Sequence, residues 1–335
     1  MAGSFSLSPT VILRCEPQYY DSYVVFDYEG VKTKFLEEDE FRALEYIQDR
    51  SADIEEISKA SGMNSKRCEN FLNHMVRLGY VVKTPHRQEV KSRRRVKIDP
   101  DLYRVFPIPF LSAPTSVDLF ITNRCNLRCV HCFSSGGEET PRDLSVEDLR
   151  SIFDQLEEMG VFEVRINGGE PLLHPEIDEV LTEIKGRRFR KVILTNGTLL
   201  DEEKILLLKK SKITPTVSLD DSVAEEHDLF RGVKGTFTRT VEALRLLKKN
   251  KVQYGINSCL HKRNLNRYED IVKLAIKNGA YRIAFLDLKV TGRMRRNIDW
   301  VPSYSEYQKV ALNLLAAKIK YKRWIDVSLD VFLHC

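Results

Sequence analysis

Long hydrophobic runs are missing from this sequence of 335 residues. No apolar stretch approaches the roughly 18 residues of a membrane-spanning helix. The opening residues, Met-Ala-Gly-Ser-Phe-Ser-Leu-Ser, lack the charged and apolar regions of a secretory signal peptide. We therefore expect no membrane partner and predict a cytoplasmic location. The composition, 42% hydrophobic and 30% charged, indicates an ordinary soluble protein with enough apolar residues for two domains.

Cysteine is too sparse for a disulfide framework. Only seven cysteines occur, and three of them are clustered at Cys125, Cys129 and Cys132. This distribution indicates metal binding in a reducing compartment. We expect Cys15 and Cys68 to be small hydrophobic residues of a core. Cys259, at the end of a predicted strand, is also expected in a core, with a cavity-facing position as the alternative. The sequence contains no Ser/His/Asp triad signal, P-loop or Rossmann fingerprint.

An excess of charge of one sign is confined to one segment. The net charge is +5, but residues 83–97 carry seven Lys and Arg against one Glu, so the rest of the chain is near −1 (5 minus 6). The segment lacks apolar periodicity, and prolines follow it at 100, 107, 109 and 114. We interpret residues 84–115 as a basic linker between two domains. Contact with nucleic acid or an acidic peptide is the alternative for such a basic run.

Residues 10–83 have the pattern of a small α+β domain. Three β-rich runs come first, at 10–14, 23–28 and 31–36, and Glu29-Gly30 predicts a two-residue hairpin turn between the last two. Helical spacing then predicts helices over 38–48, 53–60 and 64–78, separated or ended by Gly62 and Gly79. Residues 80–82 have the pattern of a small wing. The order is typical of a winged helix-turn-helix with an added sheet.

The clustered cysteines form the run Cys125-Asn-Leu-Arg-Cys129-Val-His-Cys132, directly after an apolar run at 117–122. Three thiolates in a C-x3-C-x2-C spacing can hold three irons of a [4Fe-4S] cluster, and no fourth cysteine lies nearby. One iron is then left open to a ligand. A Cys3His zinc site using His131 or His174 is the alternative. It would close the coordination shell and leave the later motifs unexplained.

Together with Gly168-Gly-Glu-Pro171, the cysteine motif resembles the radical S-adenosylmethionine (SAM) superfamily, over about residues 115–335. The resemblance implies that the amine and carboxylate of SAM bind the open iron. One electron then cleaves SAM, and the 5′-deoxyadenosyl radical abstracts hydrogen from a C–H bond. It also implies an electron donor of the ferredoxin or flavodoxin type.

Strands and helices alternate after the linker, which predicts an α/β fold with a parallel sheet. Six βα units over 116–322 predict an open, six-stranded partial (β/α)6 barrel, the architecture of the family it resembles. The predicted strands are 117–122, 161–167, 190–195, 213–219, 252–258 and 281–287. The predicted helices are 146–159, 176–185, 202–210, 238–249 and 268–278. Chemistry is expected in the loops that follow the strands.

The resemblance assigns Gly168, Gly169, Glu170 and Pro171, after the second strand, to the amino group of SAM. Glycines let backbone approach a ligand closely, and Glu170 offers a carboxylate to a cationic amine. His131 stands where the family often has an aromatic residue. We expect it to make a stacking or backbone contact with adenine and no metal bond.

Further SAM contacts are expected after the next strands. Asn196 follows the third strand. Ser218 and Asp220, after the fourth, match family positions for ribose hydroxyls or the SAM carboxylate, and their spacing of two predicts that both point inward. Arg231 is a candidate for the SAM carboxylate, with a surface salt bridge as the alternative. Asn257, in the fifth strand, lies where the family contacts ribose or carboxylate.

Two functions fit the small domain. A DNA reader would place Asn64, Lys66, Arg67 and Asn70 in a groove, but the first two helices are acidic, which opposes a phosphate backbone. The order of three strands and three helices instead resembles the peptide-recognition domain of maturases of ribosomally made peptides, similar to the small partner protein of pyrroloquinoline quinone biosynthesis. This implies that a precursor's leader adds a strand to the sheet edge and packs on the third helix. Phe71, Leu72 and Met75 would then line pockets or form the core. A purely structural module is the third possibility.

We therefore predict a peptide-modifying radical SAM enzyme of the SPASM-type maturase branch. Hydrogen abstraction from a precursor peptide would lead to cross-linking, epimerisation or another modification. A cofactor-maturation enzyme acting on a small molecule such as a tetrapyrrole is the alternative enzyme, and an iron-sulfur DNA-binding sensor is the non-enzyme alternative. We expect residues 323–335, ending at Cys335, to begin a truncated C-terminal region that holds auxiliary iron-sulfur clusters.

Overall fold

The computed structural model describes residues 4–16, 22–84, 111, 113–137 and 143–330. The chain divides into two compact units: residues 1–117, 151–164 and 187–190 form one, and residues 118–150, 165–186 and 191–335 form the other. Most of the predicted linker 84–115 lies outside the described residues, as does Cys335.

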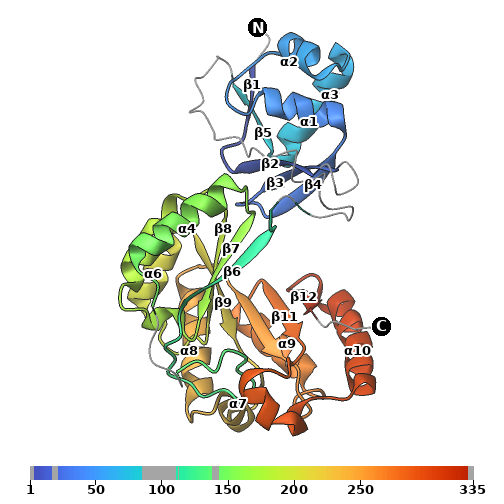
Figure 1. The fold of residues 1–335 in the computed structure, drawn as a ribbon. Helices are drawn as coiled ribbons and strands as arrows, with labels where there is room; N and C mark the ends of the chain where they lie inside the picture. Colours follow the sequence, from blue (N-terminus) through green and yellow to red (C-terminus); the bar gives the residue numbers. More distant parts are fainter. Residues whose placement is uncertain (1–3, 17–21, 85–110, 112, 138–142, 331–335) are drawn as a thin grey trace, which may run out of the picture. The chain divides into compact units, whose positions relative to one another are not determined.

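Two small sheets and three helices make up the N-terminal part of the chain (Figure 1). Strands β2 (Val11–Glu16), β3 (Ser22–Asp27) and β4 (Lys32–Leu36) form an antiparallel sheet, and β1 (Ser4–Leu7) pairs with β5 (Val81–Thr84). The helices are α1 (Glu38–Tyr46), α2 (Ile54–Ser61) and α3 (Ser65–Leu78). The sequence predicted the three-stranded sheet and all three helices. It missed β1, the partner of the strand expected as a small wing.

The turn between β3 and β4 differs from the prediction. Asp27 and Lys32 are the last paired residues, so four residues form the turn instead of two. The Asp27 carboxylate accepts a hydrogen bond from the Glu29 backbone N–H at 3.2 Å. A Cβ on Gly30 would collide with that carboxylate, while positive φ falls on Val31, at 51°. Gly30 therefore leaves room for the Asp27 carboxylate, which organises the turn.

Helix ends in this part follow the capping signals of the sequence. The Asp53 side chain accepts hydrogen bonds from the backbone of Glu55 and Glu56 and begins α2, and Asn64 caps α3 in the same way. Gly62 and Gly79 are left-handed, at φ of 81° and 87°, where they end α2 and α3. The buried core contains three α3 residues that were considered as pocket walls: Phe71, Leu72 and Met75. Their packing shows them to be core residues.

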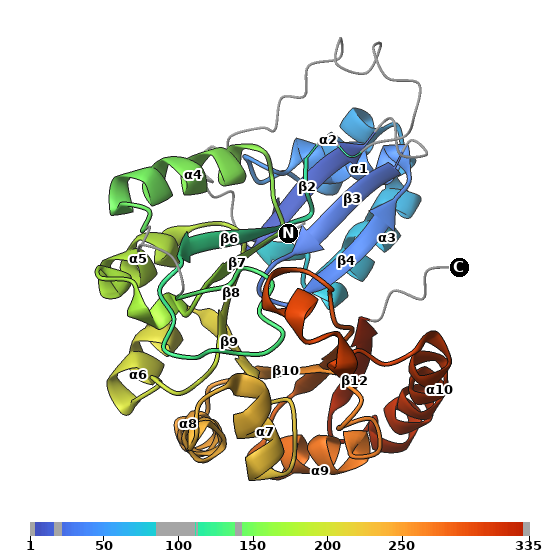
Figure 2. The same ribbon diagram turned by 60° about the horizontal axis from the view of Figure 1, so that its bottom comes forward.

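Seven strands form one large sheet in the order β12-β11-β10-β9-β8-β7-β6 (Figure 2). They are β6 (Ser116–Thr122), β7 (Glu163–Gly168), β8 (Arg190–Thr195), β9 (Ile213–Ser218), β10 (Gly255–Cys259), β11 (Arg282–Leu286) and β12 (Asp326–Asp330). The pairs from β8 to β12 are parallel. The predicted α/β fold, a partial barrel preceded by a small α+β domain, is confirmed, with one strand more than predicted.

The additional strand lies in a stretch that was assigned to a separate C-terminal region. β12 pairs in parallel with β11 from Arg282↔Asp326 to Leu286↔Asp330. Ile325 and Val327 are buried. The sheet therefore continues beyond the boundary predicted at residue 322, because helix α10 (Tyr304–Tyr321) provides the crossover that brings β12 alongside β11.

Helices lie along the outer side of the sheet (Figure 2). They are α4 (Val146–Glu158), α5 (Ile177–Glu183), α6 (Glu202–Lys210), α7 (Ala224–Arg231), α8 (Thr236–Lys249), α9 (Tyr268–Asn278) and α10 (Tyr304–Tyr321). The predicted bounds of α6 and α9 agree with the structure. The sequence reading missed α7 and α10. No described helix combines the length and apolar character that a membrane span needs.

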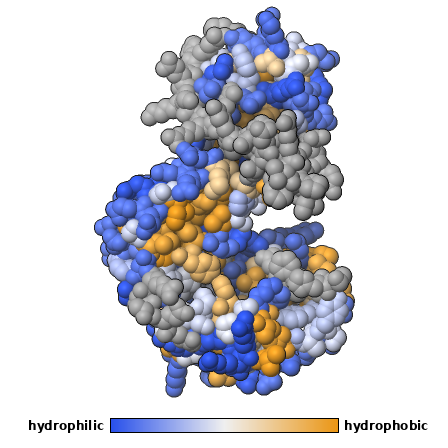
Figure 3. Space-filling view, viewed as in Figure 1, coloured by the Kyte–Doolittle hydropathy of each residue, from blue (hydrophilic) through white to orange (hydrophobic). Residues whose placement is uncertain are grey.

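Apolar surface interrupts the hydrophilic surface of the molecule (Figure 3). On α10, Leu312, Leu315 and Ile319 are exposed at a spacing that places them on one helix face. The other face of this helix, with Val310, Leu314 and Ala317, is buried. This two-sided apolar character explains why α10 lacks the clear amphipathic pattern by which a helix is recognised in a sequence.

Candidate active site

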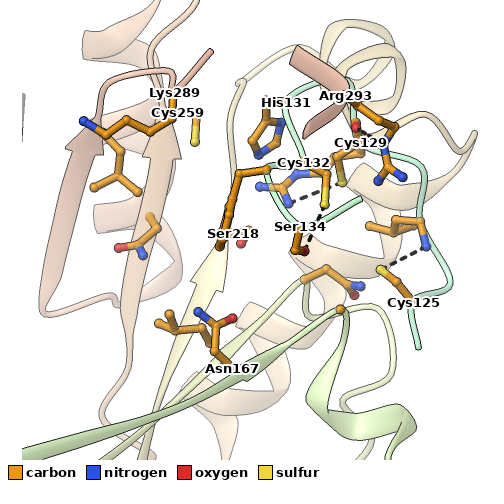
Figure 4. A pocket seen from close by; sticks show the side chains of 18 of the residues that line it. Cys125, Cys129, His131, Cys132, Ser134, Asn167, Ser218, Cys259, Lys289 and Arg293 are labelled. Atoms are coloured by element: carbon orange, nitrogen blue, oxygen red, sulfur yellow. Dashed lines mark hydrogen bonds between the residues drawn. The ribbon is translucent and has the colours of Figure 1, made fainter. Parts of the chain in front are cut away.

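A cavity of about 400 Å³ opens within the second unit, at the carboxyl ends of the strands from β7 to β11. Figure 4 shows Cys125, Cys129 and Cys132 on one side and Cys259 and Lys289 on the other. The sequence-predicted residues that line it are Cys125, Cys129, His131, Cys132, Gly168, Gly169, Asn196, Ser218, Arg231 and Asn257. Residues from six separate segments of the chain thus meet as predicted. Glu170, Pro171 and Asp220 are not part of the lining.

The three clustered cysteines project from one loop, which we call the cysteine loop (residues 123–137). Hydrogen-bond donors lie beside each sulfur: the Leu127 backbone at 3.5 Å from Cys125 Sγ, the Gly136 backbone at 3.4 Å from Cys132 Sγ, and Arg231 Nη1 at 3.8 Å from Cys129 Sγ. Burial raises the pKa of the Cys125 thiol to about 11 and also raises that of Cys129. A metal that binds here must therefore displace protons.

The zinc alternative meets two obstacles in the described part of the chain. Both ring nitrogens of His174 are engaged, Nε2 with the Leu144 carbonyl at 2.8 Å and Nδ1 with the Glu176 backbone N–H at 3.1 Å. The His131 ring stacks on Phe230, with ring centroids 4.2 Å apart and 7° between the planes. Among the described residues, no three His, Cys, Asp or Glu side chains converge to hold a single metal ion.

The cysteine loop is held by the end of α7. The backbone N–H of Arg128 donates to the Arg231 carbonyl at 3.2 Å, and that of Val130 donates to the Phe230 carbonyl at 2.9 Å. A Cβ on Gly232, at φ of 72°, would collide with the Arg128 carbonyl. The missed helix α7 therefore supports the loop that carries the cysteines and brings Arg231 beside Cys129.

Gly168 is required by its packing against the end of β6, and Gly169 by its packing against the cysteine loop. A Cβ on Gly168 would lie 2.5 Å from the Thr122 carbonyl oxygen, and one on Gly169 would collide with the Arg124 carbonyl. The backbone here also binds both neighbours, since Gly169 N–H donates to the Thr122 carbonyl at 2.8 Å and Glu170 N–H donates to the Arg124 carbonyl of the loop at 2.7 Å. Both glycines line the cavity as well, so a ligand could approach their backbone directly.

The structure directs the Glu170 carboxylate into the protein, away from the predicted amine contact. It accepts hydrogen bonds from Thr195 Oγ1 at 2.7 Å, Asn196 N–H at 2.8 Å and Leu172 N–H at 3.3 Å. Burial raises the pKa of Glu170 in spite of these three donors. Glu170 thus joins the ends of β7 and β8 and caps the short 3₁₀ turn that Pro171 begins. These two residues shape the cavity without lining it.

Asn196 lies in the cavity wall within a network of polar side chains. Its Nδ2 donates to Asn126 Oδ1 at 2.9 Å, and its Oδ1 accepts from Thr198 Oγ1 at 2.7 Å. Asn126 Nδ2 donates to Thr198 Oγ1 at 2.8 Å and completes the triangle. The motif after the third predicted strand indicated Asn196 alone, because Asn126 lies 70 residues away in the chain.

Ser218 and Asp220 do not share an orientation as predicted. Ser218 ends β9 and lines the cavity, while Asp220 lies beyond the strand and is fully buried. The alternation of side chains holds only within a strand, which is why the prediction does not extend to Asp220. Its carboxylate accepts from Arg231 Nε at 2.5 Å and from the Cys259 backbone N–H at 2.9 Å.

Asp220 holds the buried Arg231 cation beside Cys129. Arg231 is 7% exposed, so the surface salt bridge considered for it is replaced by a buried one. Although burial opposes ionisation, Arg231 lowers the pKa of Asp220 to about 2, and Asp220 raises the pKa of Arg231. Both groups are therefore charged at neutral pH. Arg231 Nη1 faces Cys129 within the cavity lining.

His131 presents a neutral ring with an unsatisfied nitrogen. Burial lowers the pKa of His131 to about 3. Its Nδ1 is buried and has no hydrogen-bond partner among the described residues. A buried polar atom without a partner is rare in proteins and suggests a site that a ligand completes.

The residues present fit an iron-sulfur cluster with a small charged ligand. Three sulfurs lie in one wall, where soft thiolate ligands favour iron-sulfur binding. The glycine backbone, the Arg231 cation and the unsatisfied Nδ1 of His131 lie in or beside the same cavity. Its volume of about 400 Å³ is in the range of ligand pockets.

Several site residues had no signal in the sequence. Asn167, Lys289 and Arg293 line the cavity. The half-buried Cys259 also lines it, which is the cavity-facing alternative to its predicted core position. Arg293 lies in an arginine-rich stretch without a recognisable motif, 161 residues after Cys132 (293 minus 132). Only the fold brings this segment to the cysteine loop.

Comparison with known proteins is consistent with a cavity that fits an iron-sulfur cluster and a small charged ligand. Residues 119–275 match the model of the radical SAM superfamily. The antilisterial bacteriocin subtilosin biosynthesis protein AlbA of Bacillus subtilis is 34% identical over 199 residues, 58% of this chain and 44% of the relative. The AdoMet-dependent heme synthase of Methanosarcina barkeri is 31% identical over 205 residues, 61% of this chain and 58% of the relative. The chain spans about half the length of these curated relatives.

Among solved structures, Streptococcus suis SuiB bound to precursor peptide SuiA matches with a TM-score of 0.74 at 20% identity. The match covers 98% of this chain and 72% of the SuiB chain. At this identity the likeness shows the fold, which is thus shared over both parts of the chain.

Proposed function

Because residues 119–275 of this chain are a radical SAM domain, we propose that the protein is an enzyme that cleaves SAM reductively and abstracts hydrogen from a ribosomally made precursor peptide. The observation that carries the first half of this proposal is the cavity wall formed by Cys125, Cys129 and Cys132. When bound, the cluster and SAM supply reductive cleavage and hydrogen-atom abstraction. The chain's own residues bind and orient them.

The three cysteines would hold a [4Fe-4S] cluster, and other residues of the cavity lining would hold SAM. The backbone of Gly168 and Gly169 offers polar groups at the end of β7. Arg231 provides a cation suited to a carboxylate, and Asn196, Ser218 and Asn257 offer hydrogen-bonding side chains. His131 Nδ1 would accept a hydrogen bond from adenine, because the ring is neutral and its Nδ1 lacks a partner among the described residues.

A free sheet edge supports a peptide substrate. β4 pairs with β3 on one side, and its other side has no partner strand among the described residues. Phe35 of this strand is 65% exposed. An extended leader peptide could add to such an edge by backbone hydrogen bonds, with Phe35 as an apolar contact. AlbA is named for bacteriocin biosynthesis and SuiB was solved with a precursor peptide, which is consistent with this proposal.

A DNA-reading role for the small domain is less well supported. Arg67, which would face a groove, pairs with Glu37 at 2.9 Å and with Asp39 at 2.6 Å. Those carboxylates would oppose a phosphate backbone at the same place. Asn64 is engaged as the cap of α3.

A small-molecule substrate is the second candidate, because a heme synthase is similar over 61% of this chain. The wall formed by Phe133, Leu286 and Leu288 is apolar enough for a tetrapyrrole edge as well as for a peptide side chain. The free edge of β4 favours the peptide.

The proposal includes a ferredoxin- or flavodoxin-type electron donor, auxiliary clusters held outside residues 4–330, and a reducing cytoplasmic compartment in which free thiols persist.

The test is anaerobic reconstitution with iron and sulfide, reduction with dithionite, and measurement of 5′-deoxyadenosine formed from SAM. We expect product from the wild-type chain and none from Cys129→Ala, with Cys68→Ala as the control for a buried cysteine remote from the cavity. A wild-type chain that holds its iron and yields no 5′-deoxyadenosine would overturn the proposal. Equal yield from Cys129→Ala would overturn it too.

A further inference from the structure

A short segment after β11 contacts the cysteine loop in addition to α7. It is the 3₁₀ turn Gly292–Arg296, and Arg293 is its second residue. Arg293 Nε donates to the Cys129 carbonyl at 2.8 Å, and Nη1 donates to the Gly136 carbonyl at 3.3 Å. The Arg293 backbone N–H donates to the Cys132 carbonyl at 3.0 Å. One residue therefore binds the backbone of two cluster cysteines.

Gly292 makes this contact sterically possible. A Cβ at this position would collide with the carbonyl oxygens of Cys132 and Phe133, and φ is 52°. Any side chain here would push the segment away from the cysteine loop. The Gly292-Arg293 pair thus allows close approach and hydrogen bonding together.

A second arginine holds the other end of the loop. Arg128 Nη1 donates to the carbonyls of Cys125 at 3.1 Å and Leu127 at 2.9 Å, and Nη2 donates to Gly137 at 3.0 Å. The carbonyls of all three cysteines are then bound by arginine donors, two of them by Arg293. With its carbonyls fixed in this way, the loop has little freedom to turn the thiols away from the cavity.

We propose that Arg293 is a positioning residue for the cluster: its guanidinium and backbone N–H hold the carbonyls of Cys129 and Cys132, and its charge lies beside the cluster. This inference rests on the proposed function. Outer-shell hydrogen bonds typically account for 10–100-fold in metal affinity. A positive charge beside an iron-sulfur cluster favours its reduced form, because reduction adds an electron.

The two roles of Arg293 can be separated by substitution. Lys keeps the charge but cannot reproduce the planar fork that binds two carbonyls at once, and Gln removes the charge. Arg296, in the same turn, is exposed and serves as the matched control. Gly292→Ala disturbs the same contact without altering a charge. It provides a second test if Arg293→Gln does not fold.

The experiment uses the anaerobically reconstituted chain and measures the rate of iron loss to a chelator and the midpoint potential by EPR-monitored titration. We expect iron loss about 10-fold faster or more in Arg293→Lys, Arg293→Gln and Gly292→Ala. We expect a more negative potential in Arg293→Gln than in Arg293→Lys, and wild-type values in Arg296→Gln.

Two results would overturn the inference in distinguishable ways. A wild-type chain that binds no iron-sulfur cluster overturns the proposed function and this inference with it. A wild-type chain that holds its cluster, with unchanged iron loss and potential in Arg293→Lys, Arg293→Gln and Gly292→Ala, overturns the inference alone.

Discussion

At the scale of single residues, the carboxylates near the site are bound by hydrogen-bond donors of the protein itself. Asp220 and Glu170 were expected to face SAM, yet each carboxylate is buried and bound to protein donors. The sequence showed correctly that carboxylates belong near these strand ends. It could not show which way they point, because that depends on donors such as Arg231 and Thr195 from other segments. Their role in this structure is to shape the walls.

We predict that Asp220→Asn lowers the free energy of unfolding by about 3–5 kcal/mol, since it leaves the buried Arg231 cation without its counter-ion. Urea unfolding of the metal-free protein measures this. Arg231→Gln in the Asp220→Asn background should restore part of the loss, because it removes the unpaired charge. Asp299→Asn is the control at an exposed carboxylate. A loss of less than about 1 kcal/mol in Asp220→Asn would contradict the buried ion pair.

At the scale of elements, contacts between loops position the site. The Gly-Gly pair after β7 fits against the cysteine loop, α7 supports that loop from one side, and the turn after β11 supports it from another. The sequence singled out the Gly-Gly pair through a motif, but as a contact for SAM and not for the cysteine loop. It did not reveal the other two, because α7 and the Gly292–Arg296 turn are short and their packing partners are distant in sequence.

For Gly169→Ala we expect overpacking against the Arg124 carbonyl, with a loss of about 1–3 kcal/mol in stability and a lower iron content after reconstitution. Gly186→Ala is the control, since its Cβ would meet no atom within 4 Å and φ is not positive. It should be neutral or slightly stabilising. Thermal unfolding and iron analysis provide the measurements. If both variants behave alike, close packing at Gly169 is not required.

The edge of β4 gives a second prediction at this scale. Phe35→Ser should weaken binding of a leader peptide about 10-fold or more if Phe35 packs on it, while stability changes by no more than about 0.5 kcal/mol because the side chain is exposed. The probe is a fluorescein-labelled peptide encoded by a short reading frame beside this gene, followed by anisotropy. Val82→Ser, at an exposed position of β5, is the control. Unchanged affinity in Phe35→Ser would place the peptide elsewhere.

At the scale of the whole molecule, buried histidines make stability depend on pH. His227 and His261 are fully buried, and burial lowers the pKa of each to about 4. Unfolding restores an ordinary histidine pKa of about 6.5. Between these values the unfolded chain binds protons that the folded chain does not. Stability therefore falls as pH decreases from about 6.5 to about 4.

Because burial also lowers the pKa of His131, to about 3, the pH dependence should have a slope of up to about 4.1 kcal/mol per pH unit, three times the value for a single proton. Urea unfolding of the metal-free protein at several pH values between 7 and 4 would measure it. His261→Asn should remove about a third of the slope, whereas His74→Asn, at an exposed position, should leave it unchanged. A flat profile between pH 6.5 and 4 would show that these rings are protonated in the folded protein.

Periodicity and motif together predicted most of the alternating elements of the large sheet, the three helices of the small domain and part of the cavity lining. These features are local or recur along the chain: apolar spacing, capping residues such as Asp53 and Asn64, and cysteines close in sequence. The sequence by itself therefore determined the fold class, the loop that brings the three cysteines together and the strand ends at which the cavity lies.

The tertiary structure decided what depends on distant partners. It turned Asp220 and Glu170 into the protein, made β12 the seventh strand, and brought Arg293 to the carbonyls of Cys129 and Cys132. Each outcome follows from a hydrogen bond, ion pair or strand pairing between segments far apart in the chain. Such contacts leave no local pattern, because any donor with suitable geometry can satisfy a buried acceptor once the fold brings the two together.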